Sequence, residues 1–307
     1  MENTTATPTM PVVLVIGTTG TVGQHLIADF DREPGDVQVR WAARRPEQVD
    51  ELRAAGREAV RLDLDDPSTF AHALHGVDRV FLLTGYTVAM LTQSKTLVDA
   101  AVKAGVSHIV HQGVFANWDT TDPHFVWHQM IEKYIEASGI AWTHLHPNVF
   151  MDGLASMIAA GDGTFPVFYG DRRVGWIAAK DIAAVTATVL RQGPDRHAGK
   201  DYWLSTEVAS GPEAAAIFSD AVGREIRCDV RGPDEFKASL ESRTPPIESW
   251  YAEGGVEFTR QVLDGRMGYI GTVRDDVEFV TGRPSTGLRE WALENRDAML
   301  ADAPADN

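Results

Sequence analysis

The residues with the clearest chemical potential form a glycine-rich turn near the N-terminus. Three glycines, at positions 17, 20 and 23, follow an apolar strand-like run and open a helical pattern. The first glycine permits a tight bend, the second lets the backbone approach a pyrophosphate, and the third lets the helix pack closely on the strand. Free N–H groups at the helix start attract the anion. The sequence therefore predicts a dinucleotide site built from Gly17, Thr19, Gly20, Thr21 and Val22.

The end of the second strand-like run indicates which dinucleotide fits. This position reads Ala43-Arg44-Arg45-Pro46 and offers no carboxylate for the adenosine ribose hydroxyls. A guanidinium fork matches phosphate oxygens, so NADPH is favoured over NADH, with Arg44 as the ligand of the 2′-phosphate. The alternative is that both arginines are merely solvated at the start of a helix. The other expected cofactor contacts are Asp63, Leu64, Thr84, Gly85, Gly113, Pro147, Asn148 and Phe150.

Strand-like and helical sequence patterns alternate in the first half of the chain, and they predict the elements that position these residues. Short apolar runs too brief for helices but suited to buried strands alternate with segments whose apolar residues recur every three or four positions. Such alternation predicts parallel strands joined by right-handed crossovers, an α/β fold with a Rossmann-type doubly wound sheet. The strand runs are 12–16, 37–42, 58–62, 77–83, 108–111 and 142–145, and the helical ones 22–30, 46–55, 68–74, 91–104 and 126–138.

Beyond residue 145 the alternation loosens, which predicts a second, helix-rich region. We expect an NADP(H)-binding domain over 11–150 and a smaller substrate-capping region over 151–300, with helices at 181–190, 212–222 and within 233–283. Two segments near 176–205, Trp176–Ala179 and Tyr202–Leu204, are expected to return and extend the main sheet. Residues 1–10 and 301–307 are expected to be a flexible leader and tail.

Composition narrows the class of partner. A net charge of −16 and a pI near 5.0 argue against nucleic acid, because no basic stripe is present to release counterions. No apolar stretch approaches the roughly 20 residues of a membrane helix. Cys228 is the only cysteine, so no internal disulfide forms, which fits the cytoplasm. The oligomeric state stays open between monomer and homodimer.

Several further motifs recur in a characteristic order, and with them the chain resembles the NmrA-like, atypical branch of the short-chain dehydrogenase/reductase superfamily, particularly its quinone- and dye-reducing members. The resemblance implies a Rossmann-type core with a small capping region that forms the substrate pocket. It covers nearly the whole chain and rests on the glycine turn, Arg44, Leu62-Asp63, VDAAVKAG at 98–105, HIVH at 108–111, HQMIEK at 128–133, SGI at 138–140, PNVFM at 147–151, DIA at 181–183 and GRP at 282–284.

The resemblance also implies that the usual acid is absent. Typical members of the superfamily carry a Tyr-x-x-x-Lys pair with a serine, in which the tyrosine protonates a carbonyl oxygen. Here the tyrosine position is His124, the lysine position is His128, and Gln112-Gly113 stands where the serine would follow. His128 matches a histidine of the reductase members and is expected to contact a ribose hydroxyl or the substrate. His124, with an ordinary pKa near 6.5, is a candidate proton donor, or else it caps or lines a loop.

Other histidines and aromatic residues have less distinctive patterns. His124, His128 and Glu132 share a spacing that suits zinc, but the family resemblance explains these positions without a metal, and none is expected. His108, His111, His144 and His146 are expected in the core or at strand edges. Aromatic and polar residues after strand ends would suit a flat, conjugated small molecule, although each could equally be core packing. These expected substrate contacts are Phe115, Asn117, Trp118, Trp127 and Met151.

Three functional hypotheses follow. The leading one is an NADPH-dependent reductase that passes hydride to a planar electrophile such as a quinone, imine, enone or dye. The second is an NADP(H)-sensing regulator that acts through protein partners, because the family also contains such members and the acid/base set is weak. The third is a biosynthetic enzyme that uses the same scaffold for non-redox chemistry.

Overall fold

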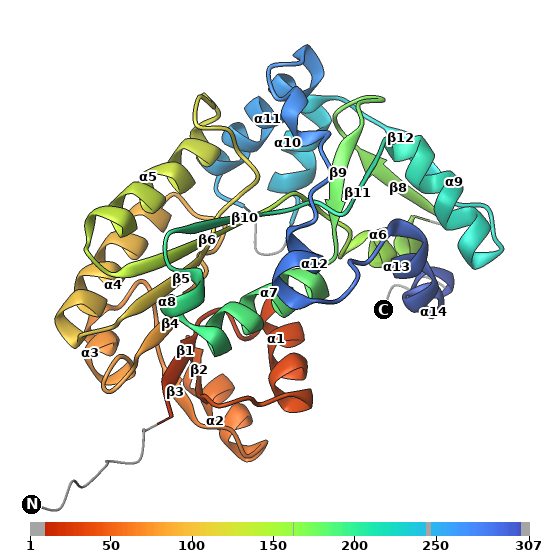
Figure 1. Ribbon diagram of the computed structural model, residues 1–307. Helices are drawn as coiled ribbons and strands as arrows, with labels where there is room; N and C mark the ends of the chain where they lie inside the picture. The colour runs from red at the N-terminus through yellow and green to blue at the C-terminus, as the bar shows by residue number, and fades with distance from the viewer. Residues whose placement is uncertain (1–9, 162, 244–246, 302–307) are drawn as a thin grey trace, which may run out of the picture.

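The main structural element is a parallel sheet. The computed structural model describes residues 10–161, 163–243 and 247–301, and within these the sheet has seven strands in the order β10-β6-β5-β4-β1-β2-β3 (Figure 1). Its pairs are all parallel, which confirms the expected doubly wound fold. The strands are β1 (Val12–Val15), β2 (Gln38–Ala43), β3 (Ala59–Arg61), β4 (Arg79–Leu82), β5 (His108–Gln112), β6 (Ala141–Pro147) and β10 (Lys200–Leu204).

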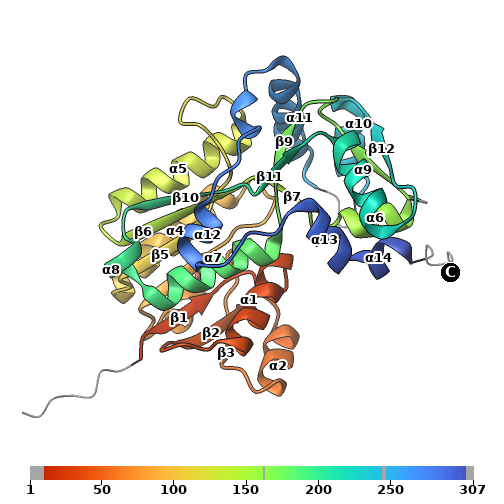
Figure 2. The ribbon, with the colours of Figure 1, turned by 45° about the vertical axis from the view of Figure 1, so that its right-hand side comes forward.

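Helices cover both faces of this sheet. Leu26 of one helix and Ile182 of another belong to the hydrophobic cluster on one face, and Leu97 and Ile131 belong to the cluster on the other. Apolar residues on a single side of each helix account for this layering. The helices are α1 (Thr21–Arg32), α2 (Pro46–Ala54), η1 (Pro67–Thr69), α3 (Phe70–Ala73), α4 (Met90–Ala104), α5 (Pro123–Ala137) and α7 (Ala179–Gln192), and Figure 2 shows α1 and α7 side by side across the sheet from α4 and α5.

The strand order fixes where a ligand can bind. β1 lies between β2 and β4. The chain passes from β1 to β2 and β3 on one side and then returns to place β4 on the other side of β1, so the strand order reverses here. This reversal opens a crevice outside the carboxyl ends of β1 and β4, the usual ligand position in open α/β sheets. The glycine turn follows β1 and therefore lies at this edge.

The rest of the chain forms a cap with its own small sheets. β7 (Val149–Phe150), β9 (Val174–Ile177) and β11 (Glu207–Ala209) form one, and β8 (Thr164–Val167) with β12 (Arg227–Val230) forms the other. Apart from β9, which contains part of the expected strand Trp176–Ala179, these short strands were not expected from the sequence. The remaining elements are α6 (Leu154–Ala160), α8 (Pro194–His197), α9 (Gly211–Val222), α10 (Pro233–Glu241), α11 (Ser249–Asp264), η2 (Gly268–Ile270), α12 (Asp276–Thr281), α13 (Leu288–Glu294) and α14 (Arg296–Leu300).

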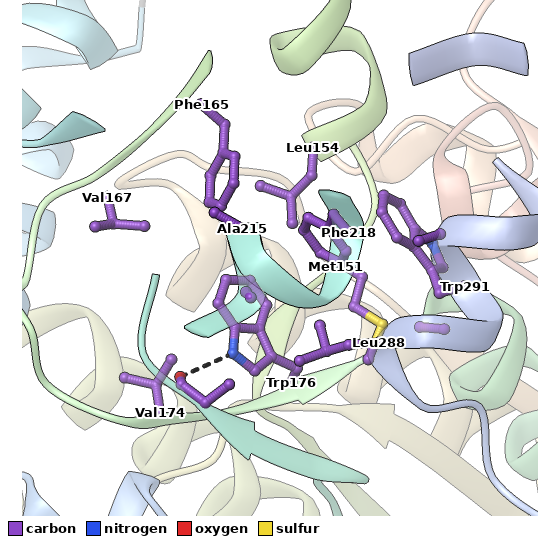
Figure 3. Packing of buried hydrophobic residues seen from close by; sticks show 14 of the residues in the cluster. Met151, Leu154, Phe165, Val167, Val174, Trp176, Ala215, Phe218, Leu288 and Trp291 are labelled. Carbon is purple, nitrogen blue, oxygen red and sulfur yellow. Dashed lines mark hydrogen bonds between the residues drawn. The ribbon is translucent and has the colours of Figure 1, made fainter. Parts of the chain in front are cut away.

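One of the two expected extensions of the main sheet is confirmed and the other is wrong. Tyr202–Leu204 lies in β10, which pairs with β6. Trp176, however, lies in β9, which pairs with β7 and β11 instead. The reason is visible in Figure 3: the Trp176 ring fills the core of the cap beside Phe218 and Leu288, and its indole N–H donates to the Ala209 carbonyl at 3.0 Å. A short buried run indicates a strand but not its partner.

Some expectations concern the ends of the chain or its environment. The leader and tail expected over 1–10 and 301–307 lie, apart from Met10 and Ala301, outside the described residues. Among the helices that the structure describes, none is long and apolar enough to span a bilayer.

Candidate functional site

The glycine turn adopts a geometry that side chains would obstruct. Gly17 has φ +84°, in the left-handed region, and a Cβ there would meet the Leu83 side chain at 2.6 Å. A Cβ on Gly23 would lie 2.1 Å from the Gly17 carbonyl oxygen. The turn is further tied to the sheet because the Thr18 hydroxyl donates to the Ala42 carbonyl at 2.9 Å. Gly17 and Gly23 therefore have the steric roles expected in a dinucleotide turn.

The start of α1 offers backbone donors rather than side chains. Its N-cap is Gly20, which has extended backbone and no capping side chain. Thr19, Gly20 and Thr21 are exposed, whereas Val22 is buried beneath the helix. N–H groups in the first turn of a helix have no partner within the helix, and they favour an anion there. A pyrophosphate fits this edge of the sheet.

The two arginines after β2 have different roles. Arg45 forms the N-cap of α2, and its guanidinium lies 3.2 Å from the Glu47 carboxylate. Arg44 is exposed, and its guanidinium has no hydrogen bond or ion pair to any described residue. Arg61, which sequence reasoning missed, donates to the Arg44 carbonyl at 3.4 Å. The Arg61 guanidinium is itself paired with the Asp66 carboxylate at 3.3 Å, so the Arg44 guanidinium is the one that can bind a phosphate monoester.

The other expected cofactor contacts follow strands at the same edge. Asp63 lies after β3, where its carboxylate accepts from the Asp65 N–H at 3.1 Å, and Leu64 is half-buried next to it. Thr84 is half-buried and Gly85 exposed in the loop after β4. Gly113 follows β5, where a Cβ would lie 2.7 Å from a Glu132 carboxylate oxygen.

The polar groups of the residues after β6 form hydrogen bonds mainly to other parts of the protein. The Asn148 amide donates to the Ile270 carbonyl at 2.8 Å, and its oxygen accepts from the Val149 N–H. Pro147 is buried, and its carbonyl accepts from the Phe115 N–H at 3.1 Å. Phe150 is half-buried against the main core. These residues join the sheet to the cap and set the position of the chain at the crevice edge.

The two candidate catalytic histidines lie one turn apart on α5, with ring centroids 5.0 Å apart. His128 is buried, and His124 is half-buried. The structure adds a partner that sequence reasoning missed: the Tyr251 hydroxyl, from α11, is hydrogen-bonded to His124 Nε2. Burial lowers the pKa of His124 to about 4. At neutral pH this imidazole is therefore neutral and can donate from only one ring nitrogen.

Aromatic side chains surround this pair. Tyr86, in the loop after β4, lies edge-on to Tyr251 at 5.6 Å, and Trp127 of α5 stacks on Trp250 of α11 at 4.4 Å. We call Tyr86, His124, Trp127, Trp250 and Tyr251 the aromatic cluster. It is held to the sheet where Glu248, before α11, accepts from the Thr87 hydroxyl at 2.8 Å. The cluster thus joins the cap to two sheet-edge segments and presents rings suited to a planar molecule.

The remaining expected substrate contacts are spread over the cap core and the loop before α5. Phe115 and Met151 are buried in the cap core cluster. Trp118 is 89% exposed, and the Asn117 carbonyl accepts from the side-chain amide of Gln129 in α5. Trp127 is the member of this set that the structure brings together with His124.

Beneath α5 lies a second group of histidines. The rings of His111 and His144, with centroids 5.5 Å apart, are fully buried, and none of their four nitrogens has a hydrogen-bond partner within the described residues. Burial lowers the pKa of His144 to about 3 and raises that of Glu132 to about 7. His108 and His146 are also buried, which confirms all four as core residues. No described group of histidine, cysteine and acidic residues is arranged to hold a metal ion.

Asp122 gives a first testable prediction. It caps α5 by accepting from the Phe125 N–H at 2.8 Å, yet its other oxygen is buried without a partner, and burial raises its pKa to about 7. We expect Asp122→Asn to keep the cap and to be more stable than the unchanged protein by a larger margin at pH 8 than at pH 6. The reason is that the unchanged protein carries the buried charge mainly above pH 7.

The matched comparison for this change is Asp122→Ala. It removes the charge and the cap together, so it should lose about 1 kcal/mol at pH 6. Urea unfolding at pH 6 and pH 8 measures both variants. An Asn variant with the same pH dependence as the unchanged protein would contradict the prediction.

The sequence and the fold of this chain are similar to those of known reductases. A (4-alkanoyl-5-oxo-2,5-dihydrofuran-3-yl)methyl phosphate reductase of Streptomyces griseus is 30% identical over 296 residues, covering 95% of this chain and 100% of the relative. An NAD(P)H azoreductase of Xenophilus azovorans is 31% identical over 302 residues, covering 94% and 100%. The fold matches a Citrobacter sp. triphenylmethane reductase complexed with NADP(H), with a TM-score of 0.77, 21% identity, and 93% and 99% coverage. Because the family model matches residues 9–251, the chain belongs to the NmrA-like family.

Proposed function

We propose that this protein is an NADPH-dependent reductase of small planar electrophiles such as quinones, enones, imines or dyes. The observation that carries the proposal is the combination, at one sheet edge, of the glycine turn with the free Arg44 guanidinium and the aromatic cluster. A reduced nicotinamide supplies two electrons and one hydrogen when it is bound. The names of the two relatives at 30% and 31% identity support reductase activity.

In this proposal, each part of NADPH and the acceptor has its own set of binding residues. The N–H groups at the start of α1, from Thr19 to Val22, would bind the pyrophosphate, and Arg44 the 2′-phosphate. The loop at Thr84 and Gly85 would follow the ribose. His128, Gly113 and the segment from Pro147 to Phe150 would line the nicotinamide end. The aromatic cluster would hold the acceptor by stacking.

Turnover with a panel of acceptors tests the proposal. Purified protein is mixed with NADPH and, in separate assays, a quinone, an enone, an azo dye and a cationic triphenylmethane dye, and the loss of nicotinamide absorbance is followed. Oxidation above the protein-free rate is expected with at least one acceptor. Tight binding of NADPH and NADP⁺ without turnover of any acceptor would contradict a reductase and favour a nucleotide sensor.

Arg44 provides a separate prediction on cofactor choice. We expect Arg44→Asp to weaken NADPH binding by about 2–3 kcal/mol, roughly 100-fold, because a charge-assisted phosphate contact becomes a repulsion. NADH has no 2′-phosphate, so its affinity should change less than about threefold. Calorimetric titration with both nucleotides measures the difference.

Arg45→Asp is the matched control for this prediction. It introduces the same charge one residue away, at a guanidinium that already pairs with Glu47, and aspartate is a good N-cap. Its effect on NADPH binding should be several-fold smaller. Equal losses of NADPH and NADH affinity in Arg44→Asp would rule out the phosphate assignment.

A further inference from the structure

The missing superfamily tyrosine has a structural counterpart in the cap. Resting on the proposed reductase function, we propose that Tyr251 is the proton donor to the reduced acceptor and that His124 positions its hydroxyl. The two residues are 127 positions apart in sequence and are brought into hydrogen-bond contact by the packing of α11 on α5. The acid thus comes from the cap, and its partner from the position where relatives of the superfamily carry the acid itself.

The Tyr251 side chain lies within the aromatic cluster, which is the proposed acceptor site. Its ring is 5% exposed and lies between the exposed Tyr86 ring at 5.6 Å and the Trp127 ring at 5.8 Å. Tyr86, 67% exposed, closes the outer side of the aromatic cluster. An acceptor that took the place of the Tyr86 ring would stack in the cluster and lie beside Tyr251.

Protonation states favour Tyr251 over His124 as the acid. Burial lowers the pKa of His124 to about 4, so its imidazolium is scarce at neutral pH. Burial, with Tyr86 and Asp122 nearby, raises the pKa of Tyr251 well above its ordinary value, so its hydroxyl keeps its proton. A neutral His124 with its proton on Nε2 donates to the Tyr251 oxygen and leaves the tyrosine O–H free to point at the acceptor.

The proton transfer balances for an enone acceptor. A hydride supplied by bound NADPH would add to the β-carbon, the C=C electron pair would form the new C=C bond of an enolate, and the C=O electron pair would move to the carbonyl oxygen. That oxygen takes the proton of Tyr251, whose O–H bond breaks, and the resulting enol converts to the saturated ketone in solution. The phenolate is stabilised by the His124 N–H and regains a proton from water. A cationic triphenylmethane dye needs no such proton, because hydride addition alone neutralises its central carbon.

This difference between acceptors defines the experiment. Tyr251→Phe should lower kcat about 100-fold with an enone and less than about threefold with a cationic triphenylmethane dye. His124→Leu should act in the same direction, and His124→Gln, which keeps an N–H donor, should recover part of the loss. Tyr134→Phe is the matched control, because the Tyr134 hydroxyl, also on α5, donates to Asp99 of α4 and not to a residue of the aromatic cluster. It should change neither rate.

The pH profile separates the two candidate acids. With Tyr251 as the acid, enone kcat/KM should be flat from pH 6 to 9. With an imidazolium of pKa about 4 as the acid, it should fall tenfold per pH unit. Equal losses with both acceptors in Tyr251→Phe, or the tenfold slope, would overturn the proposal. An unchanged protein that reduces neither acceptor would instead count against the proposed function.

A readout without turnover completes the test. Nitrogen-15 NMR of the histidine side chains at pH 7 should show His124 neutral with its proton on Nε2, and Tyr251→Phe should shift that nitrogen resonance. A charged His124, or an Nε2 resonance that Tyr251→Phe leaves in place, would overturn the dyad whether or not an acceptor is known.

Discussion

Gly23→Ala is expected to disrupt the cofactor turn more than any other single methyl group added to it. The new Cβ would lie 2.1 Å from the Gly17 oxygen and 2.7 Å from the Thr18 Cα. Both atoms belong to backbone, so no side chain can rotate away, and either the turn or α1 must shift. Overpacking of this kind costs about 3 kcal/mol. NADPH binding should weaken about 100-fold, because the N–H groups at the start of α1 move with the helix.

Gly20→Ala is the informative control for this change. Its Cβ would have its nearest neighbour, the Gly17 oxygen, at 3.4 Å, an ordinary contact. The folded protein should therefore lose only a few tenths of a kcal/mol, while close approach of a pyrophosphate is still blocked. Urea unfolding and calorimetric NADPH titration on both variants separate the effects. A Gly23→Ala protein with unchanged unfolding midpoint would show that the turn adjusts freely.

Acidification from pH 6.5 to 5 is expected to destabilise the folded protein strongly. Five histidines, His108, His111, His124, His128 and His144, have pKa values lowered by burial. Below pH 6.5 the unfolded chain binds protons at these rings and the folded chain does not, so each ring removes about 1.4 kcal/mol of stability per pH unit.

Two carboxyl groups act in the opposite direction. Glu132 and Asp122 have pKa values raised to about 7, so below pH 7 the folded chain binds protons there first and gains stability. Five histidines outweigh two carboxyl groups, and the net loss between pH 6.5 and 5 is on the order of 6 kcal/mol, a large share of the stability of an ordinary domain.

Urea unfolding from pH 7.5 to 5 measures the slope. His144→Phe should reduce it by about 1.4 kcal/mol per pH unit. Phenylalanine keeps the stacking on Trp142, at 4.5 Å between rings, and removes two nitrogens without partners. His75→Phe, on an exposed turn, is the control. A slope that His144→Phe leaves unchanged would show that this ring already titrates in the folded state.

The part of the fold that the sequence predicted is the part whose pattern is local. The runs at 12–16 and 108–111 are continuous and apolar, and the helical periodicity at 91–104 spans several turns, so each element can be recognised without its neighbours. The strands of the cap are two to four residues long. Such runs carry no measurable period, and only tertiary pairing makes them strands.

The candidate site divides in the same way. The turn at Gly17 and the exposed Arg44 follow strands directly, so their positions at the carboxyl edge follow from topology. Tyr251 lies in a helix of the cap, and no spacing relates it to His124, because their contact depends on how α11 packs on α5. The lowered pKa of His124 likewise depends on burial that a sequence does not encode locally.

The return of β10 to the main sheet limits how this protein can be divided. The chain builds β7, β8 and β9 of the cap, crosses back through α7, and pairs Lys200–Leu204 with Thr143–Pro147 before it re-enters the cap. A fragment that stops at Phe150 would lack both β10 and α7, whose Arg191 pairs with Asp29 of α1 at 2.8 Å. It would expose an unpaired strand edge and a bare apolar helix face, both prone to aggregation. No single cut in the chain therefore separates the cap from the sheet, and the cap cannot be exchanged as one contiguous segment without removing β10 and α7 from the main sheet.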